Sequence, residues 1–130
     1  MKSIVATGKR KRAIAKASLM EGKGIVRINS QLLDVYQPEL ARMKIMEPLM
    51  LAGDVTKNIN IHVNVNGSGW QSQAEASRLA IARALVNYNK KLKKTFLDYD
   101  RHLVVADTRY NEPHKPNDSK PRKARQKSYR

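Results

Sequence analysis

Residues 59–66 read Ile-Asn-Ile-His-Val-Asn-Val-Asn and alternate strictly between β-branched apolar and polar side chains. This period of two predicts a strand with one buried face and one polar face. Gly67-Ser68-Gly69 ends the strand, and residues 71–89, which contain no Gly or Pro, predict the longest helix of the chain. Its apolar stripe, which we expect to pack on the sheet, consists of Ala74, Ile81, Leu85 and Tyr88.

The segments before this unit predict further strands. Residues 13–20 and 24–29 are short runs rich in Ile, Val and Leu, and Glu21-Gly22-Lys23 separates them. This pattern is typical of a β-hairpin with a tight turn. Residues 32–36 predict a further short strand or a turn.

Helices are predicted on both sides of the central unit. Pro38 is placed to begin a helix that runs toward Leu51, and Pro48 should split or kink it. Residues 90–98 predict a shorter helix, and residues 103–106 form a last apolar patch. Strands followed by helices that cross back over them predict an α+β fold, a two-layer sandwich of a mixed β-sheet packed against helices.

Positive charge is concentrated at the two ends of the chain. The 130 residues contain 26 Lys and Arg against 11 Asp and Glu, a formal net charge of +15. Residues 1–20 hold six of the basic residues and no acid, and residues 113–130 hold seven basic residues and one acid. Cationic ends on a nearly balanced domain favour an anionic partner, and we expect nucleic acid.

The last segment is predicted to be an extended basic C-terminal tail. Pro113, Pro116 and Pro121 prevent a helix or a strand ladder from running through it, and it contains few apolar residues. We therefore divide the chain into a globular RNA-binding domain, residues 1–112, and a tail, residues 113–130. An amphipathic membrane helix needs bulky apolar residues on one side, which the tail lacks, so no membrane partner is expected.

Composition excludes several classes of protein. The chain has no Cys, which rules out disulfides and thiolate metal sites. Its longest mainly apolar stretch, residues 45–52, is far shorter than the roughly 20 residues that a membrane span needs. The N-terminus does not match a secretory signal. These features predict a cytoplasmic protein.

Three motifs allow a chemical interpretation and a structural one. Gly67-Ser68-Gly69 could cradle an RNA phosphate at a helix start, but a tight turn that needs a positive φ explains it more simply. Asp98, Asp100 and His102 could hold a hard cation, yet a charged helix end is the simpler interpretation. His62 should be an exposed or RNA-facing side chain, because no Ser or acidic partner for catalysis lies near it in sequence. We expect no enzyme activity, no cofactor and no metal.

The densest cationic cluster is Lys9-Arg10-Lys11-Arg12, which precedes a predicted strand. Successive side chains of an extended segment point to opposite sides, so the cluster can neutralise phosphates on two flanks. Aromatic residues make up only 5% of the chain, which leaves few platforms for base stacking. Phosphate contacts and RNA shape should therefore dominate over the reading of bases.

Motifs along the whole chain resemble one family. They are Thr7-Gly8 with the cationic cluster and Ala13 and Ala15, then Ile28-Asn29, Val65-Asn66-Gly67-Ser68-Gly69, Gln73-Ala74 and Ala80-Ile81-Ala82-Arg83-Ala84-Leu85. Together they resemble the S nine family of small-subunit ribosomal proteins. Asp107, Arg109 and Glu112 are similar to a run that precedes the tail in that family, and the closing residues 126–130 resemble its archaeal and eukaryotic branch.

The resemblance implies a ribonucleoprotein component that acts in translation, in the head of the small ribosomal subunit and hence in the cytoplasm. Its partners would be small-subunit ribosomal RNA, other small-subunit ribosomal proteins, and the peptidyl-site transfer RNA, which the tail would approach. The predicted RNA-binding residues are Lys9, Arg10, Lys11, Arg12, Lys16, Arg83, Arg109, Lys115, Lys120, Arg122, Lys123, Arg125 and Lys127, and the predicted tip near the transfer RNA is Ser128, Tyr129 and Arg130. The alternative is a free-standing architectural protein that binds RNA or DNA.

Overall fold

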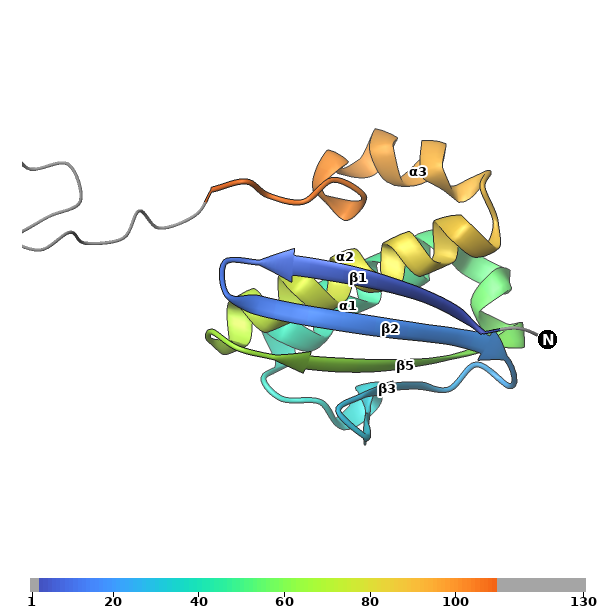
Figure 1. Cartoon of the computed structure of the whole chain (residues 1–130). Helices are drawn as coiled ribbons and strands as arrows, with labels where there is room; N and C mark the ends of the chain where they lie inside the picture. The colour runs from blue at the N-terminus through green and yellow to red at the C-terminus, as the bar shows by residue number, and fades with distance from the viewer. Residues whose placement is uncertain (1–2, 110–130) are drawn as a thin grey trace, which may run out of the picture.

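The structure, a computed structural model, describes residues 3–109, in which one sheet is covered on one face by two long helices (Figure 1). Shorter helices and turns connect these elements. The elements are β1 (Ile4–Arg10), β2 (Ala13–Glu21), β3 (Val26–Ile28), β4 (Gln31–Leu32), η1 (Leu33–Val35), α1 (Glu39–Ala52), η2 (Gly53–Asn58), β5 (Ile59–Asn66), α2 (Trp70–Tyr88), α3 (Leu92–Tyr99) and η3 (Arg101–Leu103). The predicted α+β class is confirmed. No helix in this part of the chain has both the length and the apolar character to cross a membrane.

The sheet is mixed, with the strand order β1-β2-β5-β3-β4. β2 pairs with β1 and with β5 in antiparallel fashion, whereas β3 runs parallel to β5. In this register Val63 of β5 lies between Ala17 of β2 and Ile28 of β3. All three are buried, so one continuous apolar row crosses the sheet.

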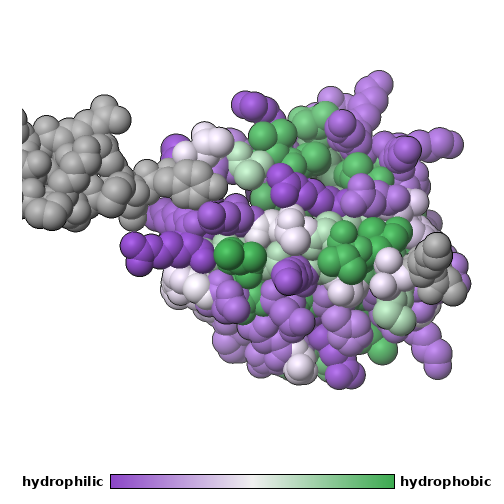
Figure 2. Space-filling view, viewed as in Figure 1, coloured by the Kyte–Doolittle hydropathy of each residue, from purple (hydrophilic) through white to green (hydrophobic). Residues whose placement is uncertain are grey.

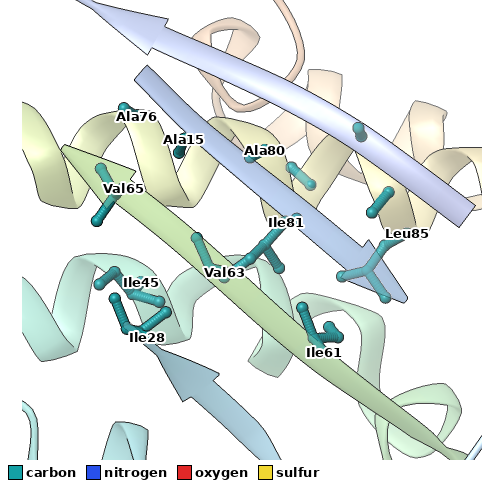
Figure 3. Packing of buried hydrophobic residues seen from close by; sticks show 14 of the residues in the cluster. Ala15, Ile28, Ile45, Ile61, Val63, Val65, Ala76, Ala80, Ile81 and Leu85 are labelled. Atoms are coloured by element: carbon teal, nitrogen blue, oxygen red, sulfur yellow. The ribbon is translucent and has the colours of Figure 1, made fainter. Parts of the chain in front are cut away.

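The core lies between the sheet and the helices, as Figure 3 shows. The apolar residues of 59–66 all face inward and are at most 5% exposed, as their alternation predicts. Small residues bring α2 close to β1: a Cβ on Gly8 would lie 2.7 Å from the backbone nitrogen of Ala80, and closer still to the carbonyl oxygen of Ala76. Gly8 is therefore required for the contact between these two elements.

The predicted hairpin between residues 13–20 and 24–29 is wrong, because β5 lies between β2 and β3. The connection passes the start of β5 instead of turning back on β2. The N–H of Gly24 donates to the carbonyl of Ile59 at 3.0 Å. The Oδ1 atom of Asn60 accepts from the N–H groups of Lys23 at 2.9 Å and of Ile25 at 3.1 Å. These bonds hold the connection across the end of β5, so that β3 pairs with β5 on the side away from β2.

β1 was not predicted as a strand. After Ile4 and Val5, its inward-facing positions carry only Ala6 and Gly8, small residues that weaken the signal of alternation. A glycine is suitable at position 8 because the backbone of α2 occupies the space that a side chain there would need. The strand places Lys9 and Arg10 in the sheet and leaves Lys11 and Arg12 in the turn before β2.

The helices follow the predicted positions closely. α1 continues through Pro48, which is buried, so the expected split does not occur. α2 begins and ends one residue before its predicted bounds, and its apolar stripe is buried except for Tyr88, which is 37% exposed. The segment predicted as a short strand or turn, residues 32–36, forms the end of β4 and η1.

Asn29 joins two strands that are distant in sequence. It has a φ of 51° in the turn between β3 and β4, a conformation that Asn tolerates better than most residues. Its Nδ2 donates to the carbonyl of Val65 at 3.0 Å, and its Oδ1 accepts from the Val65 N–H at 2.9 Å. The side chain thus extends the short parallel pairing of β3 with β5.

Candidate nucleic-acid interface

The face of the sheet opposite α1 and α2 is open (Figure 1). The register places Lys16 between Thr7 and Asn64, and it places His62 between Ser18 and Arg27. None of these outward positions carries an acid, and Lys16, Arg27 and His62 are all exposed. Figure 2 shows a mainly hydrophilic surface here, interrupted by separate hydrophobic patches. The open face therefore presents cations and hydrogen-bonding groups together.

A second cationic element lies at one end of the sheet. Lys11, with a φ of 54°, and Arg12 form the exposed turn between β1 and β2. The Gly67-Ser68-Gly69 turn touches this hairpin, since a Cβ on Gly67 would collide with the carbonyl oxygen of Arg12. Gly67 has a φ of 86°, which confirms the tight-turn interpretation. The exposed start of α2 at Trp70 adds its partial positive charge beside the cationic turn.

Arg10 points the other way, toward α2. Its Nε lies 2.7 Å from the Glu75 carboxylate, and its Nη2 lies 3.6 Å from that of Asp107. Its Nη1 also donates to the carbonyl of Arg109 at 3.0 Å. The side chain is only 14% exposed. Arg10 therefore ties β1 to α2 and to the end of the described chain.

Glu75 binds two cations, because Lys44 of α1 lies 3.2 Å from its Oε1 atom while Arg10 contacts its Oε2 atom. Burial opposes the ionisation of this carboxyl. The hydrogen bonds and charges of Arg10 and Lys44 outweigh burial and hold the pKa of Glu75 below its ordinary value. The ionised carboxylate thus links β1, α1 and α2.

A pH-dependent loss of stability should follow from Glu75. A pKa that is lower in the folded than in the unfolded state stabilises the fold above the ordinary value of 4.5 and loses that effect as the pH falls through the folded pKa. Glu75→Gln should cost about 1 kcal/mol at pH 7, a modest value because solvent screens this partly exposed group. Urea unfolding should show the difference from the parent shrinking below about pH 4.5.

The control for this experiment is Asp54→Asn. Asp54 pairs with Lys57 at 3.2 Å, but its side chain is 96% exposed, so the variant should match the parent at every pH. A difference between Glu75→Gln and the parent that stays constant from pH 7 to pH 3 would contradict the assignment.

Arg83 and Arg109 also make contacts within the domain. Arg83 donates from Nη1 to the carbonyl of Thr7 at 3.0 Å and from Nε to that of Val104 at 3.1 Å, which joins β1 to the segment after η3. Arg109 binds Asp107 through its backbone and its side chain, and these bonds hold the pKa of Asp107 well below its usual range. The RNA-binding roles assigned to both arginines stay predictions.

The acidic residues near residue 100 have a structural partner. Asp100 ends α3, accepts from the His102 N–H at 3.0 Å, and lies 3.1 Å from Arg78, which also pairs with Glu47 at 2.5 Å. This arrangement is the charged helix end that the sequence favoured. Within residues 3–109 no group of three His, Asp or Glu side chains is placed to hold a metal ion.

Two groups of cations were missed in the sequence analysis. Arg27 lies on the open face because β3 joins β5 in a parallel pairing that the predicted hairpin did not contain. Lys90, Lys91, Lys93 and Lys94 are exposed around the start of α3. Four lysines within five residues are a visible signal, but the concentration of charge at the two ends of the chain is stronger.

The remaining predicted residues belong to the tail and its tip. These residues, which lie outside the described part of the chain, are Lys115, Lys120, Arg122, Lys123, Arg125, Lys127, Ser128, Tyr129 and Arg130.

Comparison with known proteins gives a consistent result. A family model described as "Ribosomal protein S9/S16" matches residues 8–130. The chain is 47% identical over 134 residues to "Small ribosomal subunit protein uS9" of Methanococcus maripaludis, and 46% identical to the protein of the same name from Methanococcus vannielii. Both alignments cover the whole of each chain.

Proposed function

The chain belongs to the ribosomal protein S9/S16 family, and we propose that it is a structural constituent of the small ribosomal subunit that binds ribosomal RNA. This family consists of ribosomal structural proteins rather than enzymes. Membership places the chain in the ribosome, in the cytoplasm, as a ribonucleoprotein component that acts in translation. The full-length match to small-subunit proteins carries the proposal.

Ribosomal RNA binds along the open face and the adjoining turn. Lys11, Arg12, Lys16 and Arg27 are exposed there, and the acids of the domain that hold Arg10 and Arg78 lie on the helix side. Cations on a surface without acids favour contact with the phosphate backbone. Asn64 and Asn66, the exposed asparagines of β5, supply hydrogen bonds to sugar or phosphate oxygens.

Sedimentation of a cell extract tests the proposal against a free-standing nucleic-acid-binding protein. We expect nearly all of the protein to sediment with small-subunit RNA. It should remain bound after a moderate salt wash, because its many contacts across one face must all break before it dissociates. A control wash at high salt should release it, since phosphate contacts weaken with salt. A chain found mainly in the light fractions would favour the alternative.

The tail is proposed to reach the peptidyl-site transfer RNA. Its closing residues, 126–130, resemble the end of the archaeal and eukaryotic branch of the family. Arg10 holds Arg109, the last described residue, at the end of the sheet where the cationic turn lies (Figure 1). The 18 residues from 113 onward could span about 60 Å if extended, well beyond the radius of the domain.

Deleting residues 128–130 should leave the chain in the small subunit and weaken transfer RNA binding at the peptidyl site. The deletion removes Tyr129 and the guanidinium of Arg130, whose donors suit phosphate oxygens, and we expect about a tenfold loss. Filter binding of purified subunits with message and transfer RNA, at several salt concentrations, measures it.

A matched control deletes no residue but replaces Ser128 and Tyr129 by Ala and keeps Arg130, which should preserve most of the affinity. Unchanged binding after the deletion would exclude a contact of energetic weight at the tip. Failure of the deleted chain to enter the subunit would show instead that the tip serves assembly.

A further inference from the structure

α1 carries an apolar stripe on the side that faces away from the sheet. Leu40, Met43 and Met50 are 63%, 57% and 77% exposed. Their spacing of three and seven residues places them on one side of the helix, together with Glu47. The opposite side of α1, with Ala41 and Ile45, is fully buried. We call Leu40, Met43, Glu47 and Met50 the α1 face.

A hollow adjoins this face. It has a volume of about 250 Å³, and its lining includes Leu32, Met46 and Leu49. Met46 lies one turn from both Met43 and Met50, so the hollow continues the apolar surface of the helix. An apolar side chain of a partner could enter it. Methionine side chains adapt readily to the shape of such a partner.

The segment that carries the α1 face lacks the strong positive charge of the chain as a whole. Residues 31–55 contain four acids and two basic residues in a chain of net charge +15. Its two basic residues are paired, since Lys44 lies 3.2 Å from Glu75 and Arg42 lies 3.9 Å from Glu39. Two more of its acids are paired as well, Glu47 with Arg78 and Asp54 with Lys57. This segment has no excess of cations to bind a phosphate backbone, and its small net negative charge favours a basic protein.

We propose that the α1 face is a docking site for a second, basic protein of the small ribosomal subunit, which covers the stripe with apolar side chains. The two faces of the molecule then have different partners, RNA on the open sheet and protein on the helices. This assignment rests on the proposed function, because the partner belongs to the same particle.

Site-specific photo-crosslinking in purified small subunits tests the assignment. A photoreactive amino acid replaces Met43 in the full-length chain, and a second chain carries it in place of His62 on the open face. We expect the Met43 probe to give an adduct with another subunit protein of basic composition, identified by mass spectrometry. The His62 probe should give an adduct with ribosomal RNA.

The two probes separate the two proposals. An adduct with RNA, with the chain's own tail or with a second copy at Met43, or no adduct, overturns the docking site while the His62 adduct still supports RNA binding. A Met43 protein adduct without RNA at His62 supports docking and contradicts the RNA face. A chain that never enters the subunit contradicts both proposals.

A paired variant guards against a probe that disturbs assembly. Met43→Glu with Met50→Glu changes only exposed side chains, so the protein should still fold. Its affinity for RNA should stay within twofold of that of the parent. The amount of the neighbouring protein in salt-washed subunits should fall at least fivefold. Leu97→Glu with Tyr99→Glu is the control, since these α3 side chains are 40% and 56% exposed. Equal amounts of the neighbour in both double variants would overturn the proposal.

Discussion

Gly8→Ala should lose about 3 kcal/mol of unfolding free energy, at the upper end of what overpacking costs. The added Cβ would lie 2.7 Å from the nitrogen of Ala80 and would collide with the carbonyl oxygen of Ala76. Both are backbone atoms of α2, so no side chain can rotate away. β1 has to move off the helix, and the small residues beneath it lose their contacts. Urea unfolding followed by circular dichroism measures the loss.

Gly69→Ala is the matched control for this substitution. No atom outside its immediate chain neighbours lies within 4 Å of the position where its Cβ would be, and its φ of −91° suits any residue. It should lose less than about 1 kcal/mol, the cost of a poorer residue at the start of α2. Equal losses in the two variants would show that β1 and α2 are not in the close contact described above.

Neutralising the turn and the open face should weaken binding to ribosomal RNA about 100-fold. The variant combines Lys11→Gln, Arg12→Gln and Lys16→Gln, all exposed positions. Each lost phosphate contact removes on the order of 1 kcal/mol. Each should also lower the slope of log K against log salt by roughly 0.7 to 0.9. Filter binding to a small-subunit RNA fragment at four salt concentrations gives both quantities.

The control removes the same charge from another surface. Lys90→Gln, Lys91→Gln and Lys94→Gln change the net charge equally, but they lie around the start of α3. We expect a loss below tenfold, because the long-range attraction falls while the contacts on the open face remain. If the α3 variant lost more affinity than the variant of the open face, the interface would lie on α3.

Arg10 does not belong in the RNA-binding variant, although the sequence groups it with Lys9, Lys11 and Arg12. Its replacement would remove one of the two cations that lie near Glu75 and one of the two that lie near Asp107. Loss of RNA affinity could then reflect a damaged fold. The pairing of Arg10 with Glu75 becomes visible only when α2 is placed beside β1, because Glu75 lies 65 residues further along the chain.

The local sequence was sufficient for the layers of the fold. The alternation of residues 59–66 and the apolar stripe of α2 both report which side of an element is buried, and this periodicity depends only on the geometry of that element. The family resemblance could also be recognised from the sequence alone, since its motifs cover the whole chain.

Only the tertiary structure decided which elements lie next to one another. The insertion of β5 between β2 and β3, the strand β1 with its glycine, and the direction of Arg10 each depend on partners that are distant in sequence. The same is true of the α1 face, because Ala41 and Ile45 fix the buried side of the helix only after α2 has packed against it. Strand order and ion pairs are set by packing between distant segments, so local periodicity leaves them open.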